Sequence, residues 1–163
     1  MMTRRFVLTA GTLGAAAGLG LLRGGQPSRA AEVFEVAHSE AEWRKLLTPD
    51  QYSVLRDSAT ERPFTSPLLH EERTGTFACA GCDLPNFSSK TKFDSGTGWP
   101  SFWAPLDGAV KQADDHSYGM IRSAVSCSRC DGHLGHVFDD GPKPTGLRYC
   151  MNGLALKFAP SAA

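Results

Sequence analysis

Four of the five cysteines in this chain form two Cys-x-x-Cys pairs, and these pairs constrain the fold more than any other feature. One pair comprises Cys79 and Cys82, the other comprises Cys127 and Cys130, and 44 residues separate them. Four thiolates are the ligand set and number that a tetrahedral zinc ion, or an iron centre of rubredoxin type, prefers. A metal bound by both pairs would clamp two distant hairpins together.

The balance of energies favours a structural metal site. Closing a loop of this length costs roughly 3 kcal/mol, whereas a structural zinc contributes about 10–16 kcal/mol. Four protein ligands also leave no open position for water or substrate. Two alternatives are disulfides in an oxidising compartment and a redox-active Cys-x-x-Cys. In proteins of thioredoxin type the redox-active Cys-x-x-Cys occurs once, at the start of a helix that follows a strand. Neither pair in this chain has that context.

The first thirty residues have the pattern of an export signal. A twin arginine, Arg4-Arg5, precedes a mildly apolar run from Phe6 to Leu22, and Ser28-Arg29-Ala30 places small residues at the positions that a signal peptidase needs. A transmembrane anchor is the alternative, but the run is short and broken by glycines. We therefore expect residues 1–30 to be removed and residues 31–163 to reach the periplasm, already folded, by twin-arginine export.

The charge of the mature chain argues against nucleic acid as the main partner. Removing four signal arginines leaves 13 basic against 17 acidic side chains, and a tetrathiolate site would make the balance more negative. A nucleic-acid backbone requires a basic surface. We expect a single domain of ordinary size, a monomer, with no stable membrane association once the signal is removed.

Local patterns predict helices at the entry to the domain and strands beyond it. Ser39 to Glu42 forms a capping box ahead of Trp43, Leu46 and Leu47, and Thr48 to Gln51 forms a second one ahead of Tyr52, Val54 and Leu55. After Pro63, glycine and proline interrupt every amphipathic stretch. Strand-like runs remain at residues 75–79, 108–112, 118–123 and 154–158, so the sequence predicts a mainly antiparallel β domain.

The fifth cysteine, Cys150, stands apart from the metal pattern. A lone cysteine is usually a small buried hydrophobe. However, Arg148 and Asn152 flank it at a spacing of two, which on a strand places all three on one face. A cation and an amide donor favour the thiolate, and only the thiolate attacks. Upstream, His133 and His136 lie three residues apart among glycines. Each histidine could contact a ligand. The alternatives for each are a side chain on a surface loop and a further metal ligand.

An aromatic turn completes the set of unusual segments. The two glycines of Gly96-Thr97-Gly98 are followed by Trp99, Phe102 and Trp103. Packing in the core is the usual fate of tryptophan. The same cluster on a turn can also form an apolar wall for a small side chain.

Together these segments resemble the B-type peptide methionine sulfoxide reductases, over nearly all of the chain from about Ser39 to Phe158. The resemblance lies in the two cysteine pairs and in five segments, namely residues 51–56, 61–68, 93–102, 132–138 and 148–152. It implies a fold of two antiparallel sheets in a tent-like arrangement, pinned by one structural zinc ion per chain. The implied activity is reduction of the R epimer of methionine sulfoxide, free or in damaged proteins.

The resemblance also implies roles for individual residues. Cys150 would attack the sulfoxide sulfur and become a sulfenic acid, while His133 or His136 delivers a proton to the departing oxygen. Arg148 and Asn152 would orient the sulfoxide and keep Cys150 ionised. Two aromatic side chains, Trp99 and Phe138, would contact the substrate, with Trp99 against its methyl group.

One position departs from the common family pattern. Many members carry a resolving cysteine between the two glycines of the aromatic turn, where this chain has Thr97. We therefore expect an external thiol, from a thioredoxin-like partner, to reduce the sulfenic acid directly. The competing interpretations are a zinc-stabilised β binding module without catalysis and a thiol-disulfide oxidoreductase.

Overall fold

The computed structural model describes residues 33–119 and 121–161, so the expected export signal lies outside the described residues. Two short helices come first, α1 (Glu40–Leu46) and α2 (Pro49–Asp57). Nine strands follow: β1 (Gly75–Cys79), β2 (Pro85–Ser88), β3 (Lys92–Phe93), β4 (Ser101–Phe102), β5 (Val110–Asp115), β6 (Arg122–Cys127), β7 (His133–Phe138), β8 (Arg148–Met151) and β9 (Leu156–Pro160). Four single 3-10 turns lie between them, η1 (Pro67–His70), η2 (Ser89–Thr91), η3 (Ser117–Gly119) and η4 (Gly153–Ala155).

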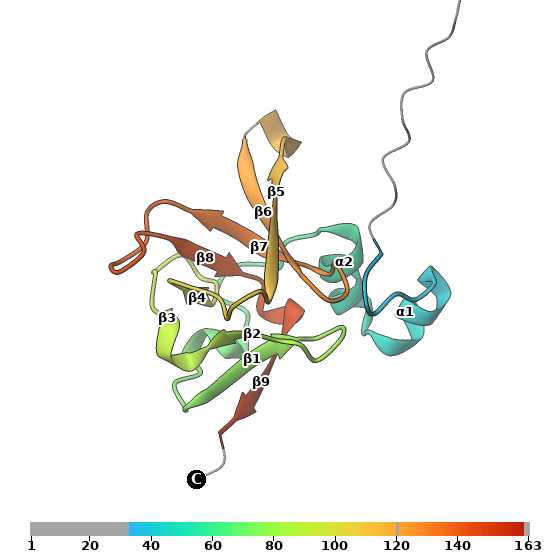
Figure 1. Ribbon diagram of the computed structural model, residues 1–163, viewed down its shortest axis with the longest axis horizontal. Coiled ribbons are helices and arrows are strands. Elements are labelled where there is room, and N and C mark those ends of the chain that lie inside the picture. The colour runs from blue at the N-terminus through green and yellow to red at the C-terminus, as the bar shows by residue number, and fades with distance from the viewer. Residues whose placement is uncertain (1–32, 120, 162–163) are drawn as a thin grey trace, which may run out of the picture. The chain divides into compact units, whose positions relative to one another are not determined.

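The strands form two antiparallel sheets, which confirms the predicted mainly β fold (Figure 1). One sheet has the order β2-β1-β9, so the last strand pairs with the first. The other has six strands in the order β3-β4-β8-β7-β6-β5. Within the described part of the chain, no helix is both long and apolar enough to cross a membrane.

Aromatic side chains join the two sheets in a common core. Phe102 of β4 stacks on Phe87 of β2 with ring centroids 4.5 Å apart, and its ring lies 5.0 Å from that of Phe77 in β1. All three side chains are completely buried. The core is therefore built between the two sheets.

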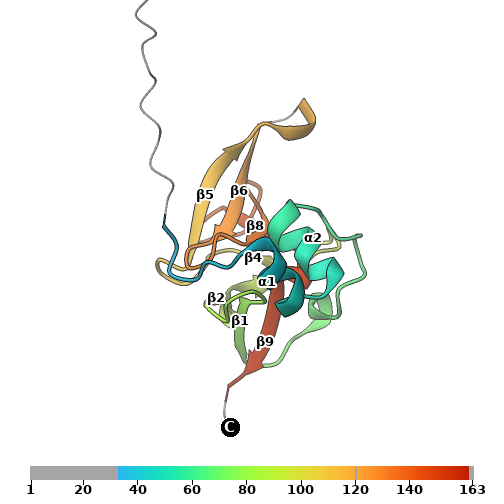
Figure 2. The same ribbon diagram turned by 90° about the vertical axis from the view of Figure 1, so that its right-hand side faces the viewer.

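Both helices begin as the capping boxes predict. The side chains of Ser39 and Thr48 accept from the backbone at the third helical position, and the reciprocal bonds from Glu42 and Gln51 are present. Tyr52, Val54 and Leu55 of α2 are buried, as are Trp43 and Leu47 at the end of α1. Leu46 is 60% exposed, so it is not buried together with Trp43 and Leu47. Figure 2 shows both helices on one side of the strands.

Three of the four predicted strand runs are shifted toward the C-terminus. The run at 108–112 becomes β5 from Val110, since Gly108 forms a turn with a φ of 64°. The run at 118–123 contains η3 and the start of β6, while Met120 lies outside the described residues. The run at 154–158 begins inside η4, where the backbone amides of Gly153 and Leu154 donate to the Glu61 carboxylate. Only the run at 75–79 coincides with a strand, β1.

The segment around the two histidines is the strand β7, which was not among the predicted strand runs. Gly135 explains how this strand fits. A Cβ atom at this position would lie 2.2 Å from the carbonyl oxygen of Cys150 on β8. The glycine therefore permits a close approach of the two central strands, and it does not mark a loop.

Candidate functional site

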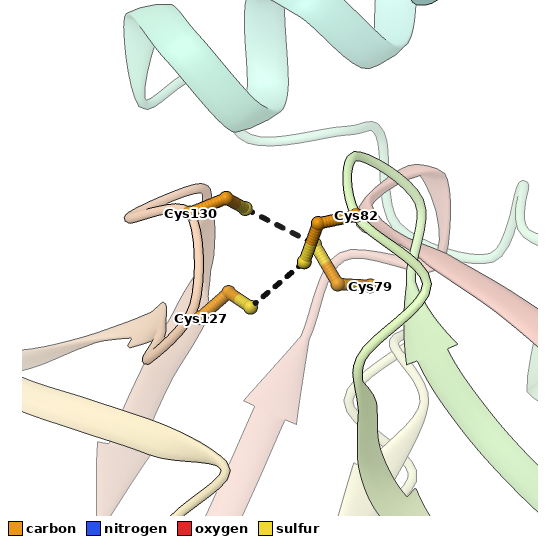
Figure 3. A group of neighbouring side chains, drawn as sticks. All are labelled: Cys79, Cys82, Cys127 and Cys130. Atoms are coloured by element: carbon orange, nitrogen blue, oxygen red, sulfur yellow. Dashed lines mark hydrogen bonds between the residues drawn. The ribbon is translucent and has the colours of Figure 1, made fainter. Parts of the chain in front are cut away.

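The four paired cysteines converge in one cluster (Figure 3). Cys79 ends β1 and Cys127 ends β6, so each pair extends from a different sheet. In both loops the residue directly after the second cysteine of the pair adopts a left-handed conformation, with φ of 58° at Asp83 and 59° at Asp131. Each of these residues donates its backbone N–H to the carbonyl of the first cysteine of the pair, at 2.9 Å.

The geometry of the cluster fits a tetrahedral metal. All four sulfur atoms lie within 4.8 Å of one another, with Cys79 Sγ 3.7 Å from Cys130 Sγ and Cys82 Sγ 3.5 Å from Cys127 Sγ. A disulfide would require about 2.05 Å. A zinc–sulfur distance of about 2.3 Å places tetrahedral ligands about 3.8 Å apart. The cluster could therefore hold a metal ion that links the two sheets.

Polar hydrogens around the sulfur atoms are consistent with thiolate ligands. The backbone N–H of Gly81 donates to Cys79 Sγ at 3.4 Å, and the buried side-chain amide of Asn86 lies 3.9 Å from Cys127 Sγ. Such donors offset the charge of a tetrathiolate centre. Arg56 of α2 donates to the backbone carbonyl of Cys130 at 2.9 Å, so α2 is anchored to the cluster.

Cys150 lies at the centre of the six-stranded sheet. Its strand, β8, runs between β4 and β7, and Cys150 is directly opposite Ser101 on one side and His136 on the other. A small cavity of about 120 Å³ opens beside its half-buried side chain. The cavity is lined by Thr60, Trp99, Arg122, Gly135, His136, Phe138, Cys150 and Asn152. Five predicted site residues therefore share one cavity.

The two histidines have different environments. His136 Nε2 lies 2.8 Å from Asp115 Oδ2, and the same carboxylate oxygen accepts from Arg122 at 2.6 Å. Hydrogen bonds from Ser117, followed by the bond to His136, hold the pKa of Asp115 well below its usual range. Asp115 therefore stays ionised, so His136 Nε2–H donates the hydrogen bond between them.

His133 is buried, and its ring is 5.2 Å from that of His136. Its Nε2 has no hydrogen-bond partner among the described residues. Burial, and next the charge of His136, lower the pKa of His133 to about 4. His133 is consequently neutral at neutral pH. The predicted site includes both imidazoles, but only His136 lines the cavity with Cys150.

The two residues that flank Cys150 each have further hydrogen-bond partners, although Arg148 also interacts with the Cys150 side chain. Arg148 forms a bidentate pair with Asp140, with both distances 2.8 Å, and its guanidinium lies 4.4 Å from the centre of the Phe138 ring. Asn152 follows the end of β8. Its side chain accepts from the backbone N–H of Glu61 and donates to the carbonyl of Leu134. Asn152 lines the cavity, whereas Arg148 shapes it through Phe138.

Of the aromatic turn, only Trp99 reaches the cavity. Its indole N–H donates to the backbone carbonyl of Glu61 at 3.2 Å, which fixes the ring. Phe102 is completely buried between the sheets, so it is a core residue and not part of a substrate wall. Trp103 does not line this cavity either.

Sequence reasoning missed three supporting groups, which are Asp115, Arg122 and Glu61. Arg122 lines the cavity and pairs with Asp115, and these two residues are direct neighbours across the β5–β6 hairpin. Glu61 is a buried carboxylate that accepts from the amides of Gly153 and Leu154, and burial raises its pKa. The signal for Arg122 was available once the hairpin register was known. The contacts of Glu61 span about 90 residues, and no local pattern reveals them.

Comparison with known proteins accounts for this arrangement. The family model described as the SelR domain matches residues 47–160. Over 120 residues the chain is 59% identical to the peptide methionine sulfoxide reductase MsrB of Pseudomonas putida, covering 73% of this chain and 90% of that one. The chain belongs to the B-type peptide methionine sulfoxide reductase family.

Other relatives agree with this assignment. The MsrB of Bradyrhizobium diazoefficiens is 56% identical over 127 residues, covering 77% of this chain and 91% of the relative. The MsrB of Agrobacterium fabrum is 53% identical over 127 residues, with 77% and 94% covered. Membership makes the protein a methionine sulfoxide reductase that uses a thiol reductant, and it disagrees with a binding module that lacks catalysis.

Proposed function

We propose that this reductase acts on the R epimer of methionine sulfoxide, free or peptide-bound, with Cys150 as nucleophile. The observation that carries the proposal is the direct pairing of Cys150 with His136 at one small cavity. The Cys150 thiolate attacks the sulfoxide sulfur, and the oxygen is protonated and transferred to the cysteine. Methionine leaves, and Cys150 becomes a sulfenic acid.

His136 is the better candidate for the proton donor. Its Nε2 lies 2.8 Å from the Asp115 carboxylate, and it lines the cavity with Cys150. His133 is neutral at neutral pH because its pKa is about 4, so it has no imidazolium proton to give. We assign His133 a packing role beside His136.

The shape of the cavity supports discrimination between epimers. The oxygen and the methyl group on the sulfoxide sulfur must face different walls. Trp99 and Phe138 supply apolar surface for the methyl group, while His136 supplies a proton for the oxygen. Exchanging the two substituents would point the oxide at the indole. A binding difference of this kind is what separates stereoisomers.

The decisive experiment is an assay of the mature protein with dithiothreitol on separated epimers. We expect turnover of the R form and none of the S form. The Cys150→Ser variant should bind substrate but produce no methionine. Equal turnover of both epimers, or an active Cys150→Ser variant, would contradict the proposal.

We also propose that an external, thioredoxin-like thiol resets Cys150. The first thiol of the reductant attacks the sulfenic sulfur and releases water, and a second thiol then releases Cys150 and leaves the reductant oxidised. The support is Thr97, whose hydroxyl lies 3.7 Å from Cys150 Sγ at the position where the family resemblance implies a resolving thiol. Non-reducing peptide mapping after one turnover should find no disulfide within the chain.

We propose zinc as the metal of the cysteine cluster, with one ion per chain in a structural role. The sulfur spacing and the purely thiolate ligand set support it. Metal analysis of protein purified without added metal should give one zinc per chain. A stoichiometric iron content with the absorption of an iron–thiolate centre would overturn the assignment.

Export to the periplasm and a monomeric state are proposals that rest on the sequence. The twin arginine at residues 4–5 and the cleavage pattern at residues 28–30 support the first. A fusion of residues 1–30 to a reporter should reach the periplasm, and replacing both arginines with lysine should block it. Sedimentation of the mature chain tests the second.

A further inference from the structure

A chain of three hydroxyl groups connects Cys150 to the backbone of the aromatic turn. Thr97 Oγ1 lies 3.7 Å from Cys150 Sγ and 2.8 Å from Ser95 Oγ. Ser95 Oγ in turn lies 2.7 Å from Ser101 Oγ, which donates to the carbonyl of Trp99 at 3.1 Å. Ser101 is completely buried, and the other two are half-buried.

The turn that carries Thr97 is held firmly in place. Gly96 and Gly98 both have positive φ, of 68° and 93°. The carbonyl of Gly98 accepts from the backbone N–H of Phe64 at 2.8 Å, and a Cβ atom on Gly98 would lie 2.8 Å from Pro63. The Thr97 hydroxyl is therefore placed against the sulfur atom by the backbone and not by chance rotation of a mobile loop.

The direction of the chain depends on the protonation of Cys150, because each hydroxyl carries one proton. With Cys150 as a thiol, the three hydroxyls and the thiol supply four protons, one for each of the four hydrogen bonds. Ser101 donates to Trp99, Ser95 to Ser101, Thr97 to Ser95, and the thiol to Thr97. With Cys150 as a thiolate, only three protons remain.

If all three hydroxyls then rotate, the sulfur atom receives a hydrogen bond and only one other hydrogen bond in the chain is lost. Thr97 donates to the thiolate, Ser95 to Thr97, and Ser101 to Ser95. The two shortest contacts are kept, and the contact given up is the longer one to the Trp99 carbonyl. A hydrogen bond to an ionised acceptor is stronger than one between neutral groups, so the exchange favours the thiolate.

We propose that Thr97 is a catalytic residue that stabilises the Cys150 thiolate through this chain, with Ser95 as the positioning residue that acts through it. The inference rests on the proposed role of Cys150 as the nucleophile. It gives position 97 a function in a chain that has no resolving thiol there. The Thr97 hydroxyl stabilises the Cys150 thiolate before it attacks the sulfoxide, and it does so again each time the reductant has restored the thiolate.

The test measures the alkylation of Cys150 by iodoacetamide in the zinc-loaded protein, without substrate, by peptide mass spectrometry. At neutral pH, Thr97→Val should react about tenfold more slowly than the unaltered protein. Thr97→Ser keeps the hydroxyl and should react within about twofold of it. Ser95→Ala should fall between them. At alkaline pH the rates should converge, because every variant is then ionised.

A matched control is Thr65→Val, which removes an exposed hydroxyl bonded only to the carbonyl of Arg62 and should leave the rate unchanged. An unaltered rate in Thr97→Val, or a Thr97→Ser variant as slow as Thr97→Val, would overturn the inference. This failure is distinguishable from that of the proposed function. An active Cys150→Ser variant refutes the nucleophile, whereas an inactive one with unaltered Thr97→Val alkylation refutes only the hydroxyl chain.

Discussion

Replacement of the buried His133 by glutamine should change how stability depends on pH. In the folded protein, burial lowers the pKa of His133 from 6.5 to about 4. Below pH 6.5 the unfolded chain therefore binds a proton that the folded protein excludes. The contribution of His133 to stability is complete above pH 6.5 and is lost as the pH falls toward 4. Between pH 7.5 and 5 this loss amounts to about 2 kcal/mol.

Urea unfolding of the zinc-loaded protein at these two pH values measures the loss. The unaltered protein should lose about 2 kcal/mol more than His133→Gln, since all other titrating groups, including the metal ligands, are common to both. His116→Gln, at an exposed position, is the control and should behave like the unaltered protein. Equal losses in the unaltered protein and His133→Gln would refute the reasoning, and with it the exclusion of His133 as proton donor.

Four further changes test the site. Thr97→Cys places a thiol beside Cys150, and peptide mapping after one turnover without reductant should find a disulfide between them. Asp115→Asn removes the carboxylate that accepts the hydrogen bond of His136 Nε2, and steady-state kinetics should show kcat reduced at least about tenfold with little change in KM. Cys82→Ser removes one of four metal ligands; metal analysis should show zinc loss, and thermal melting should show a lower Tm. Trp99→Ala removes the apolar wall, so we expect KM to rise about tenfold for the R epimer, measured by methionine release.

The features that local chemistry determines were predicted well from the sequence. A capping box satisfies backbone donors within four residues, so Ser39 and Thr48 mark the helix starts without any tertiary information. The metal cluster was equally accessible. Four cysteines in two pairs have few alternative arrangements, and a tetrahedral metal site is the one in which they converge.

The remaining features depend on contacts that the chain makes only after folding. Whether Gly135 breaks a strand or permits close packing is decided by β8, which approaches its backbone. The start of β9 is delayed because the Glu61 carboxylate accepts the amides of Gly153 and Leu154 in η4. These partners are some 90 residues apart in sequence, beyond the reach of any periodicity or turn signal.

The cysteine cluster lies at the turn of the β6–β7 hairpin, and the candidate cavity lies further along the same hairpin. β6 ends in Cys127, the pair closes at Cys130, and β7 begins three residues later and carries His136 to its position opposite Cys150. A slip of one residue between β7 and β8 would turn His136 to the other face of the sheet. A metal bound at the turn between β6 and β7 would hold this hairpin together, and β7 is the strand that brings His136, the proposed proton donor, opposite Cys150. An ion bound there would therefore support the geometry of the candidate site without contacting the substrate.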